Sequence, residues 1–396
     1  MKIGIVLPGI PKYSETFFQY KIKGLAESGF EVKLFTGDKK QRGFPYKQFT
    51  AYPVYSGKPV KQFIVTSSVL MLTFIKAPLR FIKLYFLEKK KGSSLSDILK
   101  IIYINAHILN QNLDWLHFGF AATALRRESV AEVIGAKMGV SFRGYDINIY
   151  PLKNPGCYKR LWESADKIHT ISGYLFNKAA AYGLDENKPH EIISPAIDLK
   201  RFKSKVSDGK LNEKIKILTV GRLNWIKDYE TAISVMKILK EKGLSFEYII
   251  TGAGNELERL KFAVYQSGLE NEIKFLGIKS HEEVNELMMT SDIYLQTSMQ
   301  EGFCVSVLEA QATGLLCVVS DADGLRENVV DKETGWVVRR RRPDLFAARI
   351  LEIISMSNEA RMKIALNARA RIEREFSIEL QNEKFRNFFK LSGNKN

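Results

Sequence analysis

The chain has 396 residues, of which 45% are hydrophobic and 26% are charged, and its formal net charge is +16 at pH 7. This composition excludes a disordered or fibrous protein, and the length favours two domains over a single core. Residues 1–200 carry +13 of the net charge, which indicates an anionic partner such as acidic lipid, a phosphorylated substrate or nucleic acid.

Strand and helix patterns alternate in the first half, which predicts a parallel α/β domain. Ile3–Leu7 and Val32–Thr36 are predicted strands on either side of a helix at Tyr13–Ser28. Lys58–Lys91 mixes apolar and basic residues and predicts a pair of amphipathic helices on an acidic membrane surface; the alternative is a long core helix with a cationic outer face. Its longest uncharged stretch, Gln62–Ile75, is too short to span a bilayer.

A polar stretch at Lys200–Lys214, with Asp208-Gly209 as its turn, is predicted to separate the two domains. A second α/β series follows it. Its predicted strands are Ile215–Val220, Phe246–Thr251, Ile273–Leu276, Ile293–Gln296 and Leu316–Ser320, and its predicted helices are Tyr229–Lys242, Glu256–Gln266, His281–Thr290, Phe303–Thr313, Asp344–Phe376 and Ile378–Leu391.

The segment Glu301–Ala310 places two carboxylates, Glu301 and Glu309, around the start of a predicted helix after a buried strand. Unpaired amides and the helix dipole at such a junction favour a phosphate, while the carboxylates suit neutral hydroxyl groups. Arg222 and Lys227 follow another strand and provide a guanidinium fork and a compact charge for phosphate oxygens. A sugar nucleotide contains all of these groups.

These residues resemble the retaining glycosyltransferases of family 4, which have the GT-B fold. Glu301 and Glu309 match the Glu-x7-Glu signature of that family, and Arg222 with Lys227 resembles its diphosphate clamp. The resemblance runs from about residue 2 to the C-terminus and is stronger in the second half. Further matching segments are Val220–Leu223, Thr251–Gly254 and Phe275–Gly277 in the second half, and Ser14–Phe17 and Phe142–Asp146, which resemble exopolysaccharide and lipopolysaccharide members, in the first.

The resemblance implies two Rossmann-like domains that face a cleft. Residues 1–199 would form the acceptor-side domain and residues 211–376 the nucleotide-sugar domain. A last helix within residues 377–396 would return to the first domain. Its buried side would be formed by Phe385, Phe388 and Phe389.

The resemblance also implies roles for the site residues. Glu309 would bind the ribose and Glu301 the donor sugar, while Arg222 and Lys227 would stabilise the leaving diphosphate. Amides near Phe303, Cys304 and Val305 would hold the sugar or the distal phosphate, and Gly9, Gly252 and Gly277 are assigned to the donor site as well. The predicted catalytic residues are Glu301, Arg222, Lys227 and Arg143.

Arg143 is the main departure from the family pattern, because relatives commonly carry a histidine at this position near the reaction centre. An arginine stays cationic and is no general base at neutral pH, but it can contact phosphate or sugar. Nearby His117 could lie in the cleft, although a single histidine beside Trp115 and Phe118 is more often structural.

No metal or cofactor is predicted. Asp321-Ala322-Asp323 resembles an Asp-x-Asp metal motif, but it follows a predicted strand and shows too few oxygen ligands for Mg²⁺ or Mn²⁺, so it is interpreted as a turn. Gly252-Ala253-Gly254 lacks the third glycine of a dinucleotide-binding motif and is interpreted as a tight turn.

The predicted function is transfer of a hexose, with retention, from a nucleotide-sugar donor to a lipid-linked or polysaccharide acceptor. UDP is slightly preferred over GDP as the donor nucleotide. The expected location is the cytoplasmic face of an anionic cell membrane, with no nucleic-acid partner; Cys157, Cys304 and Cys317 lack disulfide spacing, which suits a reducing compartment. The alternatives are another GT-B activity, namely a sugar-nucleotide epimerase or a phosphorylase, and a non-enzymatic basic protein that binds membranes or nucleic acid.

Overall fold

The computed structural model describes residues 1–11, 16–37, 44–204 and 209–390. Ser14 and Glu15 of the N-terminal motif, and Asp208 of the predicted turn, lie outside these ranges. The chain forms two compact units: unit 1 comprises Met1–Ile193 with Asn382–Asn396, and unit 2 comprises Ser194–Gln381.

Unit 1 contains a seven-stranded sheet with the order β3-β2-β1-β4-β5-β6-β7, in which neighbouring strands are parallel. The chain builds the sheet outward from β1 in both directions, so the strand order reverses between β1 and β4. Gly9 lies just after β1 at this point. The strands are β1 (Lys2–Leu7), β2 (Glu31–Thr36), β3 (Lys47–Thr50), β4 (Trp115–Phe118), β5 (Lys137–Phe142), β6 (Lys167–Thr170) and β7 (His190–Ile192).

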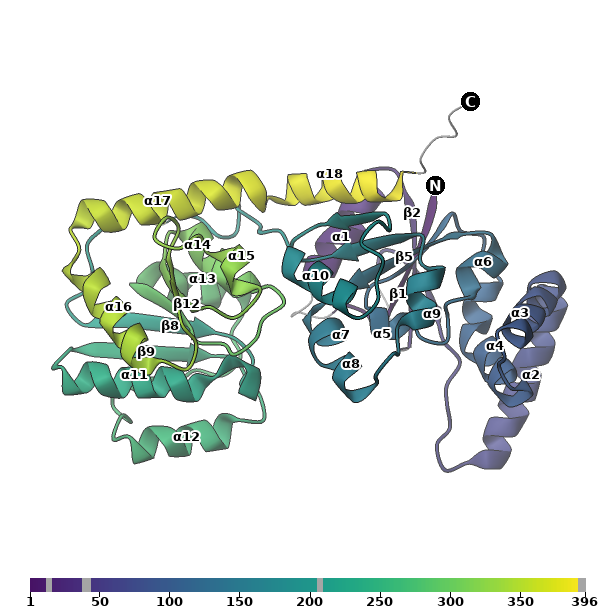
Figure 1. The fold of residues 1–396 in the computed structure, drawn as a ribbon, viewed down its shortest axis with the longest axis horizontal. Helices are drawn as coiled ribbons and strands as arrows, with labels where there is room; N and C mark the ends of the chain where they lie inside the picture. Colours follow the sequence, from purple (N-terminus) through teal and green to yellow (C-terminus); the bar gives the residue numbers. More distant parts are fainter. Residues whose placement is uncertain (12–15, 38–43, 205–208, 391–396) are drawn as a thin grey trace. The chain divides into compact units, whose positions relative to one another are not determined.

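Two helices of unit 1, α2 (Pro59–Lys76) and α3 (Pro78–Lys90), form the predicted pair. They part at Ala77 because Pro78 provides no amide for helix continuation and disfavours helical backbone in the residue before it. Both pack on α4 (Leu95–Leu109), whose first turn is capped by the Ser94 hydroxyl (Figure 1). The other helices of unit 1 are α1 (Thr16–Glu27), α5 (Ala121–Ala124), α6 (Val130–Ile134), α7 (Gly144–Asn148), α8 (Tyr150–Lys153), α9 (Lys159–Ser164) and α10 (Gly173–Ala181).

Among the described residues, no single helix is long and apolar enough to cross a bilayer; α2 and α3 meet that criterion only together, as a pair bent by 115°.

The last helix, α18 (Ile378–Phe389), starts in unit 2 and ends in the core of unit 1. Phe385, Phe388 and Phe389 are buried there with the apolar residues of β1 and α1. The prediction that the C-terminal helix returns to the N-terminal domain on its phenylalanine face is therefore confirmed.

Unit 2 contains a six-stranded sheet with the order β10-β9-β8-β11-β12-β13, in which neighbouring strands are again parallel. All five predicted strands are present, and a sixth, β13, was not predicted because its three residues are too few to show a period. The strands are β8 (Ile215–Val220), β9 (Phe246–Thr251), β10 (Ile273–Phe275), β11 (Ile293–Gln296), β12 (Leu316–Ser320) and β13 (Trp336–Val338).

Two predicted helix boundaries of unit 2 were wrong. The segment Asp344–Phe376 is two helices, because the Ser357 hydroxyl accepts the Ala360 amide and starts a new helix there. The helix predicted from Phe303 begins at Val305, since Cys304 is extended. The helices of unit 2 are η2 (Trp225–Lys227), α11 (Tyr229–Glu241), α12 (Leu257–Gln266), α13 (His281–Thr290), α14 (Val305–Thr313), α15 (Leu325–Asn328), α16 (Pro343–Ser355) and α17 (Asn358–Glu375).

Helices cover both faces of the sheet in unit 2, as the near-continuous apolar character of its strands requires. On one face α11 packs against α12 and α16, and on the other α14 packs against α13 and α17 (Figure 1). Both units thus have the predicted α/β class with a doubly wound parallel sheet.

Candidate active site

The strand order in unit 2 reverses between β8 and β11. From β8 the chain adds β9 and β10 on one side, then crosses to add β11 and β12 on the other. Loops that leave adjacent strands in opposite directions open a crevice at the carboxyl end of the sheet, where ligands of such folds bind. Arg222 and Lys227 follow β8, and Glu301 follows β11. The structure therefore brings the predicted cations and the first predicted carboxylate to the reversal point of the sheet.

Lys227 and Glu301 form an ion pair with 2.5 Å between Lys227 Nζ and Glu301 Oε1. Their side chains are only 14% and 12% exposed. The Ser298 hydroxyl donates to the same carboxylate oxygen at 2.9 Å. An enclosed, hydrogen-bonded pair is held in one geometry, unlike a surface pair that exchanges with water.

The ammonium of Lys227 stays charged at neutral pH. Burial lowers the pKa of Lys227, but the neighbouring Cys304 and Glu301 raise it above its usual range. Burial raises the pKa of the Cys304 thiol, which lies 3.9 Å from Lys227 Nζ. Because that thiol is uncharged at neutral pH, the charge that holds the ammonium is the Glu301 carboxylate.

Arg222 is exposed beside this pair. Within the described part of the chain, no hydrogen bond or ion pair engages its guanidinium. It is the cation of the predicted clamp that can turn to a ligand without first releasing a protein partner.

The amides at the start of α14 differ in what they bind. The Cys304 amide donates to Asn328 Oδ1 at 3.0 Å, and Asn328 Nδ2 donates back to the Cys304 carbonyl at 3.0 Å. Cys304 was predicted to offer its amide to the donor, and in this structure that amide is occupied. In the ranges that the structure describes, no hydrogen bond engages the amides of Phe303 and Val305.

Glu309 lies inside α14 and is 9% exposed. Burial raises the pKa of its carboxyl to about 7, although the charge of Arg201 opposes the shift. Among the described residues no hydrogen bond reaches this carboxylate, so the group is buried without a protein donor. The arrangement suits a carboxylate whose hydrogen-bond partners arrive with a ligand.

The glycines after β8, β9 and β10 hold three loops together. Gly252 has φ +137°, and a Cβ there would meet the Gly221 carbonyl oxygen at 2.0 Å. At Gly254 a Cβ would meet the Leu223 carbonyl oxygen at 2.1 Å. The Gly252 amide donates to the Gly277 carbonyl at 2.8 Å. The close approach of these loops explains the glycines at positions 252 and 254, and the amide of Gly252, a residue assigned to the donor site, is occupied.

Asp321 and Asp323 pair with arginine. Asp321 accepts the Arg340 amide at 2.9 Å and lies 3.5 Å from Arg326, while Asp323 lies 3.6 Å from Arg340. Burial raises the pKa of Asp321, but the amide and charge of Arg340 lower it below its usual range. No cluster of three or more His, Cys, Asp or Glu side chains able to hold a metal ion was found among the residues that the structure describes.

The remaining predicted site residues, Gly9 and Arg143, belong to unit 1. Arg143 follows β5, and its guanidinium carbon lies 3.7 Å from the centre of the Phe17 ring and 4.7 Å from that of Phe18. Its amide donates to Asp146 Oδ2 at 3.0 Å. Burial raises the pKa of Asp146 to about 6, opposed by the amides of Ala122 and Arg143. The rings of Phe17 and Phe18 therefore pack against the Arg143 guanidinium and hold its orientation.

His117 is structural. It is fully buried, and its Nε2 lies 2.8 Å from Lys21 Nζ and 2.8 Å from Ser141 Oγ. This agrees with the structural alternative given for it above.

Sequence reasoning missed several polar residues that support the site. Asn328 fixes the turn before α14, and Ser298 holds Glu301. The Tyr294 hydroxyl donates to the Ser306 hydroxyl at 2.7 Å and so ties β11 to the first turn of α14. The polar run Gln296-Thr297-Ser298 at the end of a buried strand was the available signal for this support, whereas Asn328 gave none, because it lies far from the motif in sequence.

Known proteins resemble the chain in sequence. Residues 200–371 match the family model of the glycosyl transferases group 1. The amylovoran biosynthesis glycosyltransferase AmsK of Erwinia amylovora is 29% identical over 296 residues, which cover 72% of each chain. The N,N'-diacetylbacillosaminyl-diphospho-undecaprenol alpha-1,3-N-acetylgalactosaminyltransferase of Campylobacter jejuni is 26% identical over 68% of this chain and 76% of that protein.

Solved structures resemble the chain over nearly its whole length. Anabaena HepE, in complex with UDP and glucose, has a TM-score of 0.72 and 16% identity, with 98% of both chains covered. Sucrose-phosphate synthase of Thermosynechococcus elongatus has a TM-score of 0.73 and 15% identity, again with 98% of both chains covered. These likenesses confirm the predicted GT-B fold. The matched segment at residues 200–371 and the relatives in sequence support a glycosyltransferase activity for the chain, and the solved structures show its fold.

Proposed function

We propose that the protein is a retaining hexosyltransferase that moves a hexose from a nucleotide-sugar donor to a lipid-linked or polysaccharide acceptor in cell-surface glycan synthesis. Support for the acceptor comes from the relatives' names: AmsK serves amylovoran biosynthesis, and the Campylobacter jejuni enzyme acts on a diphospho-undecaprenol acceptor. An Escherichia coli relative, 26% identical over 50% of this chain, transfers galactose from UDP-Gal to a diphosphoundecaprenol-linked sugar. As the donor nucleotide we propose UDP, by a slight preference over GDP; the HepE structure contains UDP.

The observation that carries the proposal is the enclosed Lys227–Glu301 pair at the reversal point of the sheet, with Arg222 exposed beside it. A donor diphosphate placed there would meet two cations, and its sugar would meet the Glu301 carboxylate. Glu309 would accept hydrogen bonds from the ribose, which explains a buried carboxylate without a protein donor. The free Phe303 and Val305 amides would take the distal phosphate or the sugar.

The reaction that fits these groups is front-face displacement. The acceptor oxygen forms a bond to the anomeric carbon on the side from which the diphosphate leaves, and the bond between that carbon and the phosphate oxygen breaks. The acceptor's proton passes to the departing phosphate oxygen. Arg222 and Lys227 stabilise the charge that develops on the diphosphate, and the protein contributes mainly positioning and electrostatics. Arg143 of unit 1, oriented by Phe17 and Phe18, stays a proposed contact for phosphate or sugar as a fixed cation.

We propose that transfer requires no metal, because two cations and the start of α14 supply the positive charge that a metal would bring. Asp321 and Asp323, the pair that resembles a metal motif, already pair with Arg340. We also propose that the enzyme works at the cytoplasmic face of the cell membrane, where a lipid-linked acceptor would lie.

The test is donor binding and transfer in the Arg222→Ala/Lys227→Met variant. We expect UDP affinity to fall at least about 100-fold, since a hydrogen bond to a charged group contributes about 1.5–3 kcal/mol. Affinity for uridine, which lacks phosphate, should change little. The matched control is Lys237→Ala/Lys261→Met, which removes two exposed cations of the same unit. Transfer to a lipid-linked acceptor should persist in chelator.

Unchanged UDP affinity in the first variant would overturn the clamp. An absolute Mn²⁺ or Mg²⁺ requirement that Asp321→Ala abolishes would overturn metal independence. Release of nucleoside diphosphate in the absence of any acceptor, or formation of an epimerised sugar nucleotide, would favour the other GT-B activities over transfer.

A further inference from the structure

The outward side of α2 and α3 is an apolar surface in contact with solvent. From Gln62 to Ile75 the sequence contains no charged residue, yet only Val69 and Thr73 of α2 are buried. Phe63 and Leu79 are 72% and 82% exposed. A helix face of this length without charge is abnormal on a water-facing surface. The outward face is formed by Val60, Phe63, Ile64, Met71, Leu72, Phe74, Ile75, Leu79, Ile82 and Phe86.

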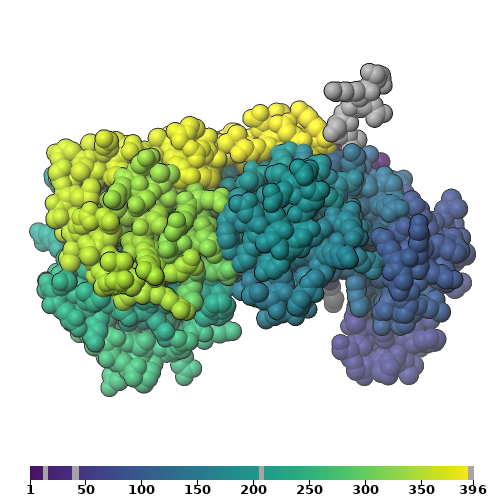
Figure 2. Space-filling view, in the orientation of Figure 1, coloured from purple at the N-terminus to yellow at the C-terminus, as the bar shows by residue number. Residues whose placement is uncertain are grey.

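The opposite side of the two helices is fixed to unit 1. Val69 of α2 packs in a small cluster with Tyr103 and Ala106 of α4. Arg80 of α3 donates to the carbonyls of Leu109 and Gln111, each at 2.9 Å. Because these contacts hold the inner side, the apolar side is presented outward, on the lobe that α2 and α3 form at the edge of unit 1 in Figure 2.

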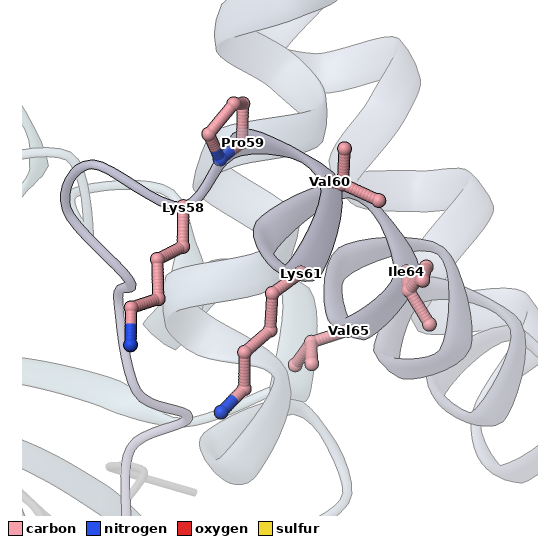
Figure 3. Close-up of a pocket in the computed structure, with 6 residues that line it drawn as sticks. All are labelled: Lys58, Pro59, Val60, Lys61, Ile64 and Val65. Carbon is pink, nitrogen blue, oxygen red and sulfur yellow. The ribbon is translucent and has the colours of Figure 1, made fainter.

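Lysines flank the apolar face. Lys58 and Lys61 lie at the start of α2, Lys76 at its end, and Lys89 and Lys90 at the end of α3. Figure 3 shows Lys58 and Lys61 extended to the same side of an open hollow that Pro59, Val60, Ile64 and Val65 complete.

Negative charge is absent from the exposed surface of this segment. Between Lys58 and Lys91 the only acidic residue is Glu88, which is 1% exposed and paired with Arg160. The segment therefore complements an anionic surface.

These features decide between three environments for the outward face of α2 and α3: a second copy of the chain, a membrane that the helices span, and the surface of an anionic bilayer. A second copy of the chain would bring two lysine-flanked faces together with no exposed carboxylate to meet them, because a two-fold interface pairs a surface with itself. A membrane span would need both sides of α2 to be free, but the inner side packs on α4. An anionic bilayer accepts both the apolar side chains and the flanking ammonium groups.

We propose that the outward face of α2 and α3 inserts into the interfacial layer of an anionic bilayer, with the flanking lysines at the lipid headgroups. The inference deepens the proposed function, on which it rests for the membrane location. It differs from a purely electrostatic attachment, because the apolar side chains hold the protein when salt screens the lysines. Arg80 and Lys83 are not among the flanking cations, because each donates to a backbone carbonyl of unit 1, Arg80 to that of Leu109 and Lys83 to that of Glu132.

The experiment is co-sedimentation of the full chain with phosphatidylcholine vesicles, with and without phosphatidylglycerol, at low and high salt. In Phe63→Ser/Met71→Ser/Phe74→Ser, affinity should fall at least about 100-fold at both salt concentrations, since each inserted side chain contributes roughly tenfold or more. The matched control Phe262→Ser/Tyr265→Ser/Leu366→Ser removes equally exposed apolar residues of unit 2 and should bind like the wild type.

A second variant isolates the charge. Lys58→Gln/Lys61→Gln/Lys76→Gln should lose about fivefold per lysine at low salt and much less at high salt. The control Lys237→Gln/Lys261→Gln/Lys363→Gln changes three exposed lysines of unit 2. Insertion depth is read directly with Phe63→Trp, whose fluorescence brominated lipid should quench more than that of a Phe262→Trp control.

Circular dichroism and the UDP-induced thermal shift establish that each variant is folded. Wild-type binding by the serine variant, no vesicle binding by the wild type, or no added quenching in Phe63→Trp would each overturn the proposal. So would a wild-type dimer that the serine substitutions dissociate without altering vesicle binding, because the face would then belong to a second copy. The vesicles contain no donor or acceptor, so failure here leaves transfer to a water-soluble acceptor analogue intact, and failure of transfer leaves vesicle binding intact.

Discussion

At the scale of single residues, the site depends on how charge is enclosed. Lys227 and Glu301 neutralise each other inside unit 2, whereas Glu309 is buried with no opposite charge in hydrogen-bond contact. Removal of one member of an enclosed pair leaves the other charge buried, so single alanine variants at Lys227 or Glu301 mix loss of function with loss of stability. Glu309 offers a cleaner measurement.

We expect Glu309→Gln to stabilise the protein above pH 7. The pKa of Glu309 rises from 4.5 to about 7 on folding, so the native state keeps a proton that the unfolded state loses between these values. The unfolding free energy of the wild type therefore falls by roughly 3 kcal/mol as pH rises through this window, and the glutamine variant lacks that loss. The measurement is urea unfolding at pH 5 and pH 8, with the exposed Glu258→Gln as control. If the unfolding free energies of Glu309→Gln and the wild type differed by the same amount at pH 5 and pH 8, this result would contradict a raised pKa for Glu309.

At the scale of elements, a polar chain crosses the core of unit 1. Lys21 of α1, His117 of β4, Ser141 of β5 and His169 of β6 follow one another at 2.8 Å. His169 Nε2 then lies 2.9 Å from the Ile193 carbonyl oxygen. The Lys21 ammonium nitrogen also lies 4.2 Å from the centre of the Phe385 ring of α18. Among the described residues no carboxylate pairs with Lys21, so the chain fixes the positions of these elements at a cost in desolvation.

We expect Lys21→Met to stabilise unit 1, by about 1–3 kcal/mol. Burial, with a smaller contribution from Arg143, lowers the pKa of Lys21 well below its usual value. The native state thus binds fewer protons than the unfolded state below pH 10.5, and the penalty grows as pH falls. The gain in unfolding midpoint should therefore be larger at pH 6 than at pH 9. Lys23→Met, on the same helix with its side chain 67% exposed, is the control. Destabilisation at both pH values would show that the amine contributes more through its contacts than its burial costs.

At the scale of the whole molecule, α18 is the part of the chain that both units share. It leaves unit 2 at Gln381 and places Phe385, Phe388 and Phe389 in the core of unit 1. Unit 1 is therefore complete only when α18 has been made. Unit 2 contains Arg222, Lys227, Glu301 and Glu309 within Ser194–Gln381.

We expect a chain that ends at Gln381 to lose the fold of unit 1 and to keep that of unit 2. The three phenylalanines contribute roughly 5–9 kcal/mol of burial, which is comparable to the whole stability of a domain. Hydrogen exchange should show fast exchange in β1 and β4 and protection in β8 and β11, with the UDP-induced shift retained. A chain that ends at Lys390 keeps α18 and serves as control. Full protection of β1 in the shorter chain would contradict this role.

Local pattern alone determined the α/β class and the strands of unit 2 apart from β13, whereas β3 to β7 and α4 to α10 of unit 1 were not predicted. Ile215–Val220 and Leu316–Ser320 were predicted to the residue, because buried parallel strands are apolar runs bounded by turn residues. The spacing of Arg222, Lys227 and Glu301 also indicated a site for an anionic ligand, since the carboxyl ends of parallel strands meet at one edge.

Only the tertiary structure decided which groups are available. The Cys304 amide donates to the Asn328 side chain, and the Arg80 guanidinium donates to two backbone carbonyls of unit 1. The apolar face of α2 is exposed although its composition also suited a core helix. Hydrogen-bond partners distant in sequence and the burial of each side chain depend on how elements pack, and neither leaves a periodic signal in the sequence. The sequence therefore indicated the kind of site, and packing determined its charge states and the surface that the protein presents.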